Sequence, residues 1–194
     1  MNPEDRARRV MKLEGRRIDK LVRSAANLAS ASVPSLDRRD EIIGIADRLS
    51  RTITPHTACA RGCSECCHMS TTLSGYEAGK IGRFLGREPR RLGRKVGANP
   101  GLAEELRKRF TGMPCPFLER GRCTVYPVRP IACRIHHTMM DDESSCRMRL
   151  NEDGTAANPT PALNLGTVGT ASSAIFAGDD FGDIREFFPA DGEP

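Results

Sequence analysis

The stretch CARGCSECC, residues 59–67, is the strongest structural signal in this 194-residue chain because it contains four cysteines. Neighbouring residues point their side chains in different directions, so Cys66 and Cys67 seldom bind one tetrahedral ion together. The pair therefore indicates two metals, one polynuclear cluster, or one thiol left free. Cys63 and Cys66 form a C-x-x-C step, whose spacing lets both sulfurs reach one metal from a tight turn. We interpret the stretch as part of a metal site.

Four more cysteines follow this stretch, and we expect them to complete the metal ligation. Eight thiols divide into two sets of four, which would satisfy two four-coordinate centres. The predicted metal ligands are Cys59, Cys63, Cys66, Cys67, Cys115, Cys123, Cys133 and Cys146. The alternative is that these residues are small buried hydrophobic side chains, as free cysteines often are.

The N-terminal sequence MNPEDRARR, residues 1–9, is charged and lacks the apolar stretch of a secretory signal. We therefore expect a cytoplasmic protein, in which reduced thiols favour metal binding over disulfides. The longest uncharged stretch, residues 154–178, is rich in Gly, Thr, Asn, Ser and Pro. The sequence accordingly predicts no membrane-spanning segment.

Two segments, HTACARGCSECC at residues 56–67 and CPFLERGRCTVYPVRPIACR at residues 115–134, resemble the CxxCxxCC family of zinc- or iron-chelating proteins. Its members are also described as cysteine-cluster or iron–sulfur-containing proteins. The resemblance covers roughly residues 55–150 and implies metal ligation by all eight cysteines. Three residues separate Cys59 from Cys63, whereas the family name implies two between the first pair of cysteines. A family of flagellin lysine N-methylases has a similar cysteine arrangement, which implies an enzyme as an alternative.

The choice of metal lies between an iron–sulfur cluster and zinc, because soft thiolates bind both. The dense group in residues 63–67 and the Cys115-Pro116 pair favour the cluster, whereas zinc would be favoured by a second C-x-x-C step. We expect a metal-binding protein that serves electron transfer, metal handling or sensing. The alternatives are an enzyme related to the lysine N-methylases and a structural zinc adaptor with a basic partner-binding face.

Four histidines lie close to cysteines in the sequence and could replace a thiolate or donate a hydrogen bond to a bound sulfur. They are His56, His68, His136 and His137. Because eight cysteines already satisfy two four-coordinate centres, we expect each histidine to lie beside the site or on the surface. Arg134 and Tyr126 are further candidate donors, although ordinary packing explains them equally well.

The apolar periodicity predicts a mainly α fold, with an N-terminal helical hairpin and a cysteine-rich helical module held together by metal. The expected helices span residues 4–31, 36–53, 76–85, 89–96 and 100–110. Ser74 and Glu77 fit the capping-box pattern of a helix start. A short β-hairpin with a glycine-containing turn should place Cys115 and Cys123 at neighbouring positions. A helical turn after Pro130 should then carry Cys133 and Arg134 toward the site.

Composition and patterning divide the chain into three parts. Residues 1–54 form the helical hairpin, residues 55–150 the cysteine-cluster metal-binding domain, and residues 151–194 an acidic, partly ordered C-terminal tail. Apolar residues in the tail could dock one short helix on the body. Only 38% of the residues are hydrophobic and none is tryptophan, so metal ligation should replace part of the missing core.

Basic residues concentrate in the middle of the chain. Residues 51–135 carry 16 basic and 6 acidic side chains, and the densest basic stretch runs from Lys80 to Arg109. We interpret this stretch either as a surface that binds a protein or an anionic partner, or as a solvated helix face. It lacks the interleaved aromatic residues that stack on bases, which argues against nucleic acid as the partner.

Overall fold

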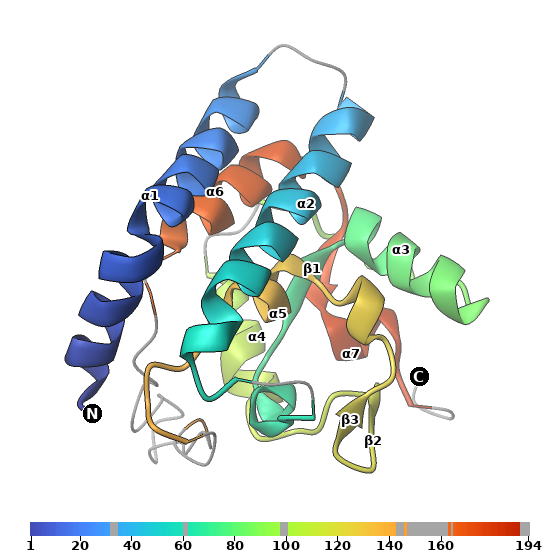
Figure 1. Cartoon of the computed structure of the whole chain (residues 1–194). Helices are drawn as coiled ribbons and strands as arrows, with labels where there is room; N and C mark the ends of the chain where they lie inside the picture. The colour runs from blue at the N-terminus through green and yellow to red at the C-terminus, as the bar shows by residue number, and fades with distance from the viewer. Residues whose placement is uncertain are drawn as a thin grey trace. The chain divides into compact units, whose positions relative to one another are not determined.

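The fold of the protein was taken from a computed structural model that describes residues 1–31, 35–59, 62–97, 101–142, 146, 163 and 165–190 (Figure 1). Its α-helices are α1 (Pro3–Ser30), α2 (Ser35–Ile53), α3 (Gly75–Leu85), α4 (Leu102–Phe110), α5 (Ile131–Ile135), α6 (Gly166–Ile175) and α7 (Ile184–Phe187). Short 3-10 helices are η1 (Thr54–His56), η2 (Glu65–His68) and η3 (Tyr126–Val128). The prediction of a mainly α protein is confirmed, and the role of metal in holding it together stays a prediction.

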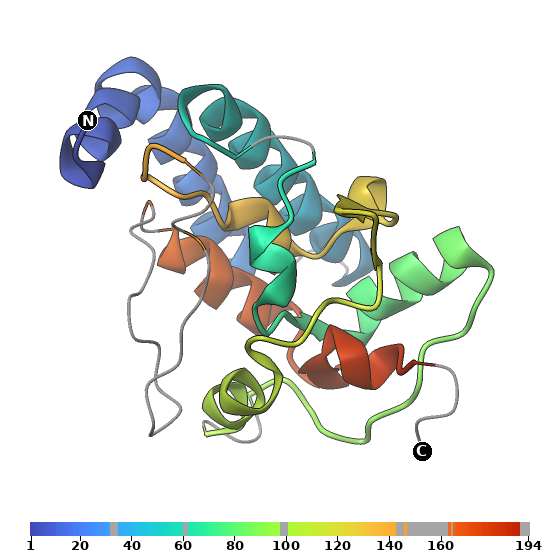
Figure 2. The ribbon, with the colours of Figure 1, turned by 90° about the horizontal axis from the view of Figure 1, so that it is seen from below.

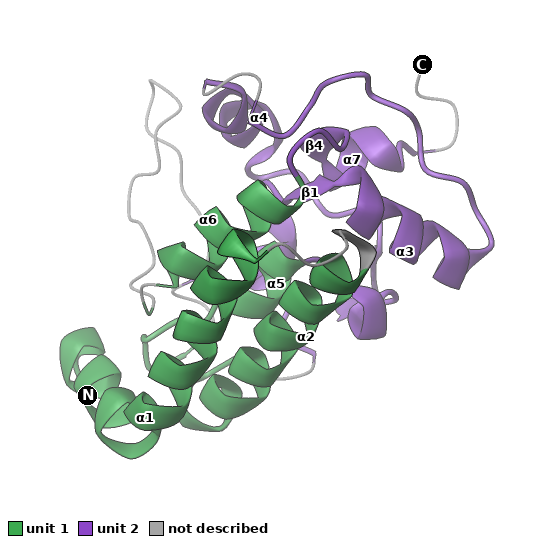
Figure 3. Cartoon of the chain, turned by 90° about the horizontal axis from the view of Figure 1, so that it is seen from above, with its two compact units in different colours: residues 1–60, 131–145, 160–176 green, residues 61–130, 146–159, 177–194 purple. Residues whose placement is uncertain are grey.

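The strands of the described residues are few and short. Strand β1 (Thr72–Ser74) pairs antiparallel with β4 (Phe181–Asp183), and β2 (Leu118–Glu119) pairs antiparallel with β3 (Arg122–Cys123). The chain divides into two compact units, each built from three segments (Figure 3). Unit 1 comprises residues 1–60, 131–145 and 160–176, and unit 2 comprises residues 61–130, 146–159 and 177–194.

Unit 1 is a helical assembly in which α2 packs against α1, α5 and α6, and α1 also packs against α6. The predicted helical hairpin of α1 and α2 is confirmed, and its two helices lie side by side in Figure 1. Their buried apolar residues are Val10, Ile18, Ala25, Ile42, Ile45, Ala46, Leu49 and Ile53. On α1, Leu13 is 57% exposed, whereas Ile18 is buried.

Unit 2 is built around the β1–β4 pair, with α3 and α7 beside it in Figures 1 and 2. The buried cluster of this unit consists of Leu73, Ala78, Ile81, Phe117, Val125, Ile184, Phe187 and Phe188. A second cluster joins Leu102, Leu106 and Phe110 of α4 to Phe181 of β4. The C-terminal region therefore supplies core residues. It contributes α6 to unit 1, and β4 and α7 to unit 2. The sequence predicts only one docked helix.

Helix α3 begins as the sequence predicts. The Ser74 hydroxyl accepts a hydrogen bond from the Glu77 backbone amide at 3.3 Å, and the Glu77 carboxylate accepts one from the Ser74 amide at 2.9 Å. These two bonds complete a capping box and satisfy amides that would otherwise lack partners. On α3, Ala78 and Ile81 are buried, whereas Phe84 is 51% exposed and Leu85 is 37% exposed.

The helix expected over residues 89–96 is absent, and this prediction was wrong. The backbone of the segment pairs instead with residues near β4, since the Val96 amide donates to the Asp179 carbonyl at 3.0 Å and the Phe181 amide donates to the Arg94 carbonyl at 2.7 Å. Gly93 has a φ of 68°, which is incompatible with a right-handed helix. Pairing with β4 therefore replaces the expected helical hydrogen bonds.

Candidate metal centre

The structure distributes the eight cysteines unevenly between the units. Unit 2 contains Cys63, Cys66, Cys67, Cys115, Cys123 and Cys146, and unit 1 contains Cys59 and Cys133. No disulfide joins any of the eight, and Cys146 is buried, whereas the other seven are partly exposed. The dense part of the predicted ligand set thus lies within unit 2.

The first cysteine loop is a tight 3-10 turn, η2. The Cys67 amide donates to the Ser64 carbonyl at 2.9 Å, and the Met69 amide donates to the Cys66 carbonyl at 3.1 Å. This turn brings the two adjacent thiols together, so that Cys67 forms a side-chain hydrogen bond with Cys66. The neighbouring cysteines therefore face a common region even though their Cβ atoms leave the backbone in different directions.

The thiols of Cys66, Cys115 and Cys123 have shifted pKa values, and of these three only the pKa of Cys66 is lowered. The hydrogen bond with Cys67 is the main reason that the pKa of Cys66 falls to about 7, and the positive charge of Arg129 acts in the same direction. The Arg129 guanidinium stacks on the Tyr126 ring, with its carbon 4.0 Å from the ring centroid. A lowered pKa favours the thiolate, which is the form that binds metals.

The second cysteine segment is hydrogen-bonded to the first. The Cys115 amide donates to the Cys67 carbonyl, and the Gly112 amide donates to the His68 carbonyl, each at 2.7 Å. Cys115 lies just before β2, and Cys123 lies on β3 opposite Leu118. The predicted hairpin is confirmed, but Cys115 lies outside its ladder because the strands are only two residues long.

The hairpin turn and the apolar core position the second pair of thiols. Arg120 and Gly121 have φ values of 48° and 73°, as a type I′ turn requires. Cys115 and Cys123 pack against the buried cluster of unit 2. Burial raises the pKa of Cys115 to about 11 and also raises that of Cys123, and the charge of Cys123 raises the pKa of Cys115 further. Cys123 is also within electrostatic reach of Cys66, which connects the two loops.

A buried arginine and a buried aspartate support both cysteine segments from the C-terminal part of unit 2. Arg185 Nη2 donates to the carbonyl oxygens of Cys67, Met69 and Met113, and Arg185 Nε donates to that of Pro114. Asp183 is fully buried and accepts from Arg185 Nη1 at 2.8 Å. It also accepts from the Ser70 hydroxyl and the Thr71 amide. This pair therefore fixes the backbone on both sides of the thiols.

The remaining predicted residues lie elsewhere. In unit 1, the Cys59 sulfur accepts a hydrogen bond from the Thr138 amide at 3.3 Å, and Cys133 is carried on α5 as the helical turn predicts. Arg134, considered as a donor to the site, is buried and forms an ion pair with Asp47 of α2. Its observed role is to join two helices of unit 1.

The histidines are divided between the units, with His68 in unit 2 and the other three in unit 1. His137 is buried, and its Nε2 lies 3.1 Å from the Thr54 hydroxyl and 3.4 Å from that of Ser50. His56 lies 3.4 Å from a Glu14 carboxylate oxygen. Burial lowers the pKa of His136, which favours its neutral form.

The donor chemistry of unit 2 fits a soft metal centre. Thiols are the ligands preferred by zinc and by iron–sulfur clusters, and Arg129 offers a positive charge beside the Cys66 thiolate. Within the described residues, no three or more His, Cys, Asp or Glu side chains are arranged as a set that could hold a metal ion. The assignment of the eight ligands therefore stays a prediction.

Sequence reasoning missed three residues at this site: Arg129, Asp183 and Arg185. Asp183 could have been found, because Asp183 and Glu186 follow the same capping pattern that located the start of α3, and they form a second capping box at α7. Arg185 is not part of this pattern. Arg129 carries no comparable signal, since a single arginine between two short apolar segments is common.

These features define a class of thiol-rich protein suited to chelating a soft metal. A family model described as "CxxCxxCC: Putative zinc- or iron-chelating domain" matches residues 58–157. The chain belongs to this family. Comparison with curated proteins and with solved structures finds no significant match. None of the helices in the described ranges is both long enough and apolar enough to cross a membrane.

Proposed function

We propose that the cysteines of this protein hold an iron–sulfur cluster that serves electron transfer, metal handling or sensing. The observation that supports this most is the meeting of two cysteine segments in unit 2, where the Cys115 amide is hydrogen-bonded to the Cys67 carbonyl. Cys66 and Cys67 hydrogen-bond each other, and charge interactions connect Cys66 to Cys123 and Cys123 to Cys115. Each of these four thiols, which come from three short segments, thus interacts with at least one of the others.

The surroundings of these thiols suit a bound cluster. A cluster of this kind supplies one-electron transfer when it is bound. Arg129 would offset the negative charge of the thiolates, and the apolar residues around Cys115 and Cys123 would limit access of water. The ligand set predicted from the sequence also contains Cys63 and Cys146 of unit 2 and Cys59 and Cys133 of unit 1. A reducing compartment such as the cytoplasm would keep all of them available.

Zinc is the alternative occupant, and anaerobic purification with metal and sulfide analysis separates the two. Iron with acid-labile sulfide and a brown colour supports the cluster. Stoichiometric zinc without visible absorbance contradicts the cluster and favours the structural zinc adaptor. Cys66→Ser and Cys67→Ser should each lower the metal content, and Ser64→Ala in the same turn is a matched control that removes no thiol. Full occupancy in either cysteine variant would remove that residue from the ligand set.

A second candidate is an enzyme related to the cysteine-cluster lysine N-methylases. The observation that favours it is a cavity in unit 2 with Cys115 in its wall. A centre with four protein ligands leaves no position for a substrate, whereas a catalytic centre commonly keeps one open. The number of cysteines that bind the metal, measured by X-ray absorption of the loaded protein, therefore discriminates between the candidates. The basic residues 80–109 remain the proposed surface for a protein or anionic partner.

A further inference from the structure

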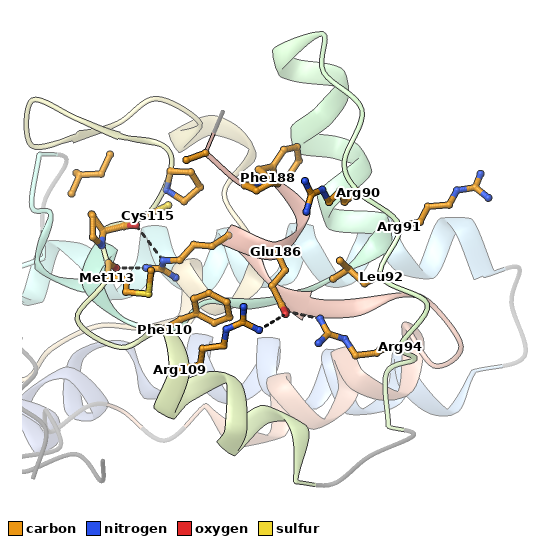
Figure 4. Close-up of a pocket in the computed structure, with 16 residues that line it drawn as sticks. Arg90, Arg91, Leu92, Arg94, Arg109, Phe110, Met113, Cys115, Glu186 and Phe188 are labelled. Carbon is orange, nitrogen blue, oxygen red and sulfur yellow. Dashed lines mark hydrogen bonds and ion pairs between the residues drawn. The ribbon is translucent and has the colours of Figure 1, made fainter. Parts of the chain in front are cut away.

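Unit 2 contains a cavity of about 680 Å³ whose wall is rich in arginine (Figure 4). It is formed by three segments, residues 90–94, 109–118 and 185–190. Its charged lining residues are Arg90, Arg91, Arg94, Arg109, Arg185 and Glu186. Five guanidinium groups therefore accompany one carboxylate. The volume is within the range of about 300–1,000 Å³ that is typical of small-molecule sites.

The single carboxylate lies between two of the arginines. Arg94 Nη2 donates to Glu186 Oε2 at 2.6 Å, and Arg109 Nη1 lies 3.6 Å from Glu186 Oε1, as Figure 4 shows. The Glu186 side chain is only 11% exposed, whereas those of Arg94 and Arg109 are 36% and 64% exposed, so solvent reaches the guanidinium groups more than the carboxylate. Two guanidinium groups thus converge on one carboxylate, as they could on an anionic group of a ligand.

The other three arginines of the wall differ in their contacts and orientation. Arg185 donates to Asp183 and to backbone carbonyls, so its role is structural, and Arg91 points away from the other labelled residues in Figure 4. Arg90 is exposed and is fixed at its backbone by donation to the Phe187 carbonyl at 2.9 Å. The lining also includes Phe110, and the Arg109 guanidinium carbon lies 4.8 Å from the centroid of that ring.

Apolar side chains complete the cavity, namely Leu92, Phe110, Met113, Leu118 and Phe188. An apolar wall beside an arginine cluster suits a ligand with two different ends. The arginine fork matches the oxygens of a phosphate or carboxylate, and an apolar wall gains from covering hydrocarbon. An extended acidic peptide or a nucleic acid would make little use of the apolar wall.

We propose that this cavity binds a small amphipathic anion, with a phosphate or carboxylate head among the arginines that line it and a short apolar body against Phe110 and its neighbours. The site needs no metal. It therefore goes beyond the proposed metal-binding function, and the two can fail separately.

The test is isothermal titration calorimetry on the full chain, with metal content measured on the same samples. The probes are hexyl phosphate, hexanoate, inorganic phosphate and hexanol. We expect hexyl phosphate to bind at least about tenfold more tightly than inorganic phosphate or hexanol, because only the first uses both parts of the wall. Hexanoate reports whether a carboxylate head substitutes for phosphate. Binding of either amphipathic anion supports the proposal.

Variants locate the binding. Arg90→Gln and Arg109→Gln should each weaken hexyl phosphate about tenfold, which corresponds to loss of one charge-assisted hydrogen bond. Arg83→Gln makes the same charge change on the exposed side of α3, outside the cavity, and should leave binding unchanged. Glu186→Gln removes the competing negative charge, whereas the Gln amide oxygen can still accept from the Asp183 backbone amide at the start of α7. This variant should tighten binding several-fold.

Three outcomes overturn the proposal. The first is no binding of either amphipathic anion to the original protein at about 1 mM. The second is an equal loss of affinity in Arg83→Gln and Arg109→Gln, which would indicate a general charge effect. The third is tighter binding of a poly-glutamate peptide than of hexyl phosphate, which would assign the surface to an acidic protein partner.

Discussion

Replacing Arg185 with leucine should destabilise unit 2 and loosen the cysteine segments. The side chain is 8% exposed and donates to four backbone carbonyls in addition to the Asp183 carboxylate. Two of the carbonyls belong to residues 67 and 69, next to the first pair of thiols, and two belong to residues 113 and 114, just before Cys115. One substitution would therefore release both cysteine segments.

The size of the effect follows from burial. Removing one partner of a buried ion pair costs about 3–5 kcal/mol, because the other charge is left without compensation. Asp183 is fully buried, so solvent does not reduce this cost. The bonds to the Cys67 and Met69 carbonyls are long, at 3.4 and 3.3 Å, and should add little. We expect a loss of about 4 kcal/mol, a large fraction of the roughly 5–15 kcal/mol that stabilises a typical domain.

Tyrosine fluorescence is a suitable measurement for this variant. The chain has no tryptophan, and its two tyrosines, Tyr76 and Tyr126, both belong to unit 2, so their emission during urea unfolding reports on this unit. Arg185→Lys should recover part of the loss, since it keeps the charge but not the planar fork. Arg83→Leu, at an exposed position of α3, is the control and should change stability by less than about 0.5 kcal/mol. A loss below about 1 kcal/mol in Arg185→Leu would refute the reasoning.

Three further predictions test the thiols and helix α3. In metal-free protein, alkylation of Cys66 by iodoacetamide should reach half its maximal rate near a pH of about 7, because the pKa of Cys66 lies there. The pKa of Cys115 is raised to about 11, so Cys115 should react only at higher pH. Peptide mass spectrometry that finds Cys115 modified first would contradict this order. Gly82→Ala should lower stability by about 1–3 kcal/mol, since its Cβ would meet a backbone oxygen at 2.5 Å. The Cβ of Gly79→Ala would meet only a flexible side chain at 3.6 Å, so this variant should be neutral or stabilise the protein by up to about 1 kcal/mol. Equal melting temperatures for the two variants would be evidence against the close contact at position 82. Ser74→Ala should cost about 1 kcal/mol in thermal unfolding through loss of the capping box, and an unchanged transition would show that the cap contributes nothing.

The parts of the fold that could be predicted are those encoded by local patterns. The 3.6-residue periodicity located α1 and α2, and the Ser74–Glu77 pattern located the start of α3. Both signals depend on residues within one or two helical turns of each other. The glycine at position 121 similarly indicated the β2–β3 turn. Such features need no information about distant parts of the chain.

The missed features depend on contacts between distant segments. Residues 89–96 have the proline of a helix start, but their backbone amides and carbonyls pair with residues 179–181. The apolar residues of the C-terminal region indicated one docked helix, but they form α6, α7 and β4, whose partners lie in distant segments of the chain. Arg185 was overlooked because most of its partners are backbone carbonyls, whose positions leave no trace in the sequence.

The same long-range contacts change how the family match should be understood. The match ends at residue 157, whereas Asp183 and Arg185, which hold the backbone beside Cys67 and Cys115, lie beyond it. The β4 strand and α7 also supply buried residues to the core on which Cys115 and Cys123 pack. The matched segment therefore contains the thiols, but the described structure that orders them extends into the C-terminal region. Metal affinity in this chain should accordingly depend on residues outside the cysteine motif as well as on the cysteines themselves.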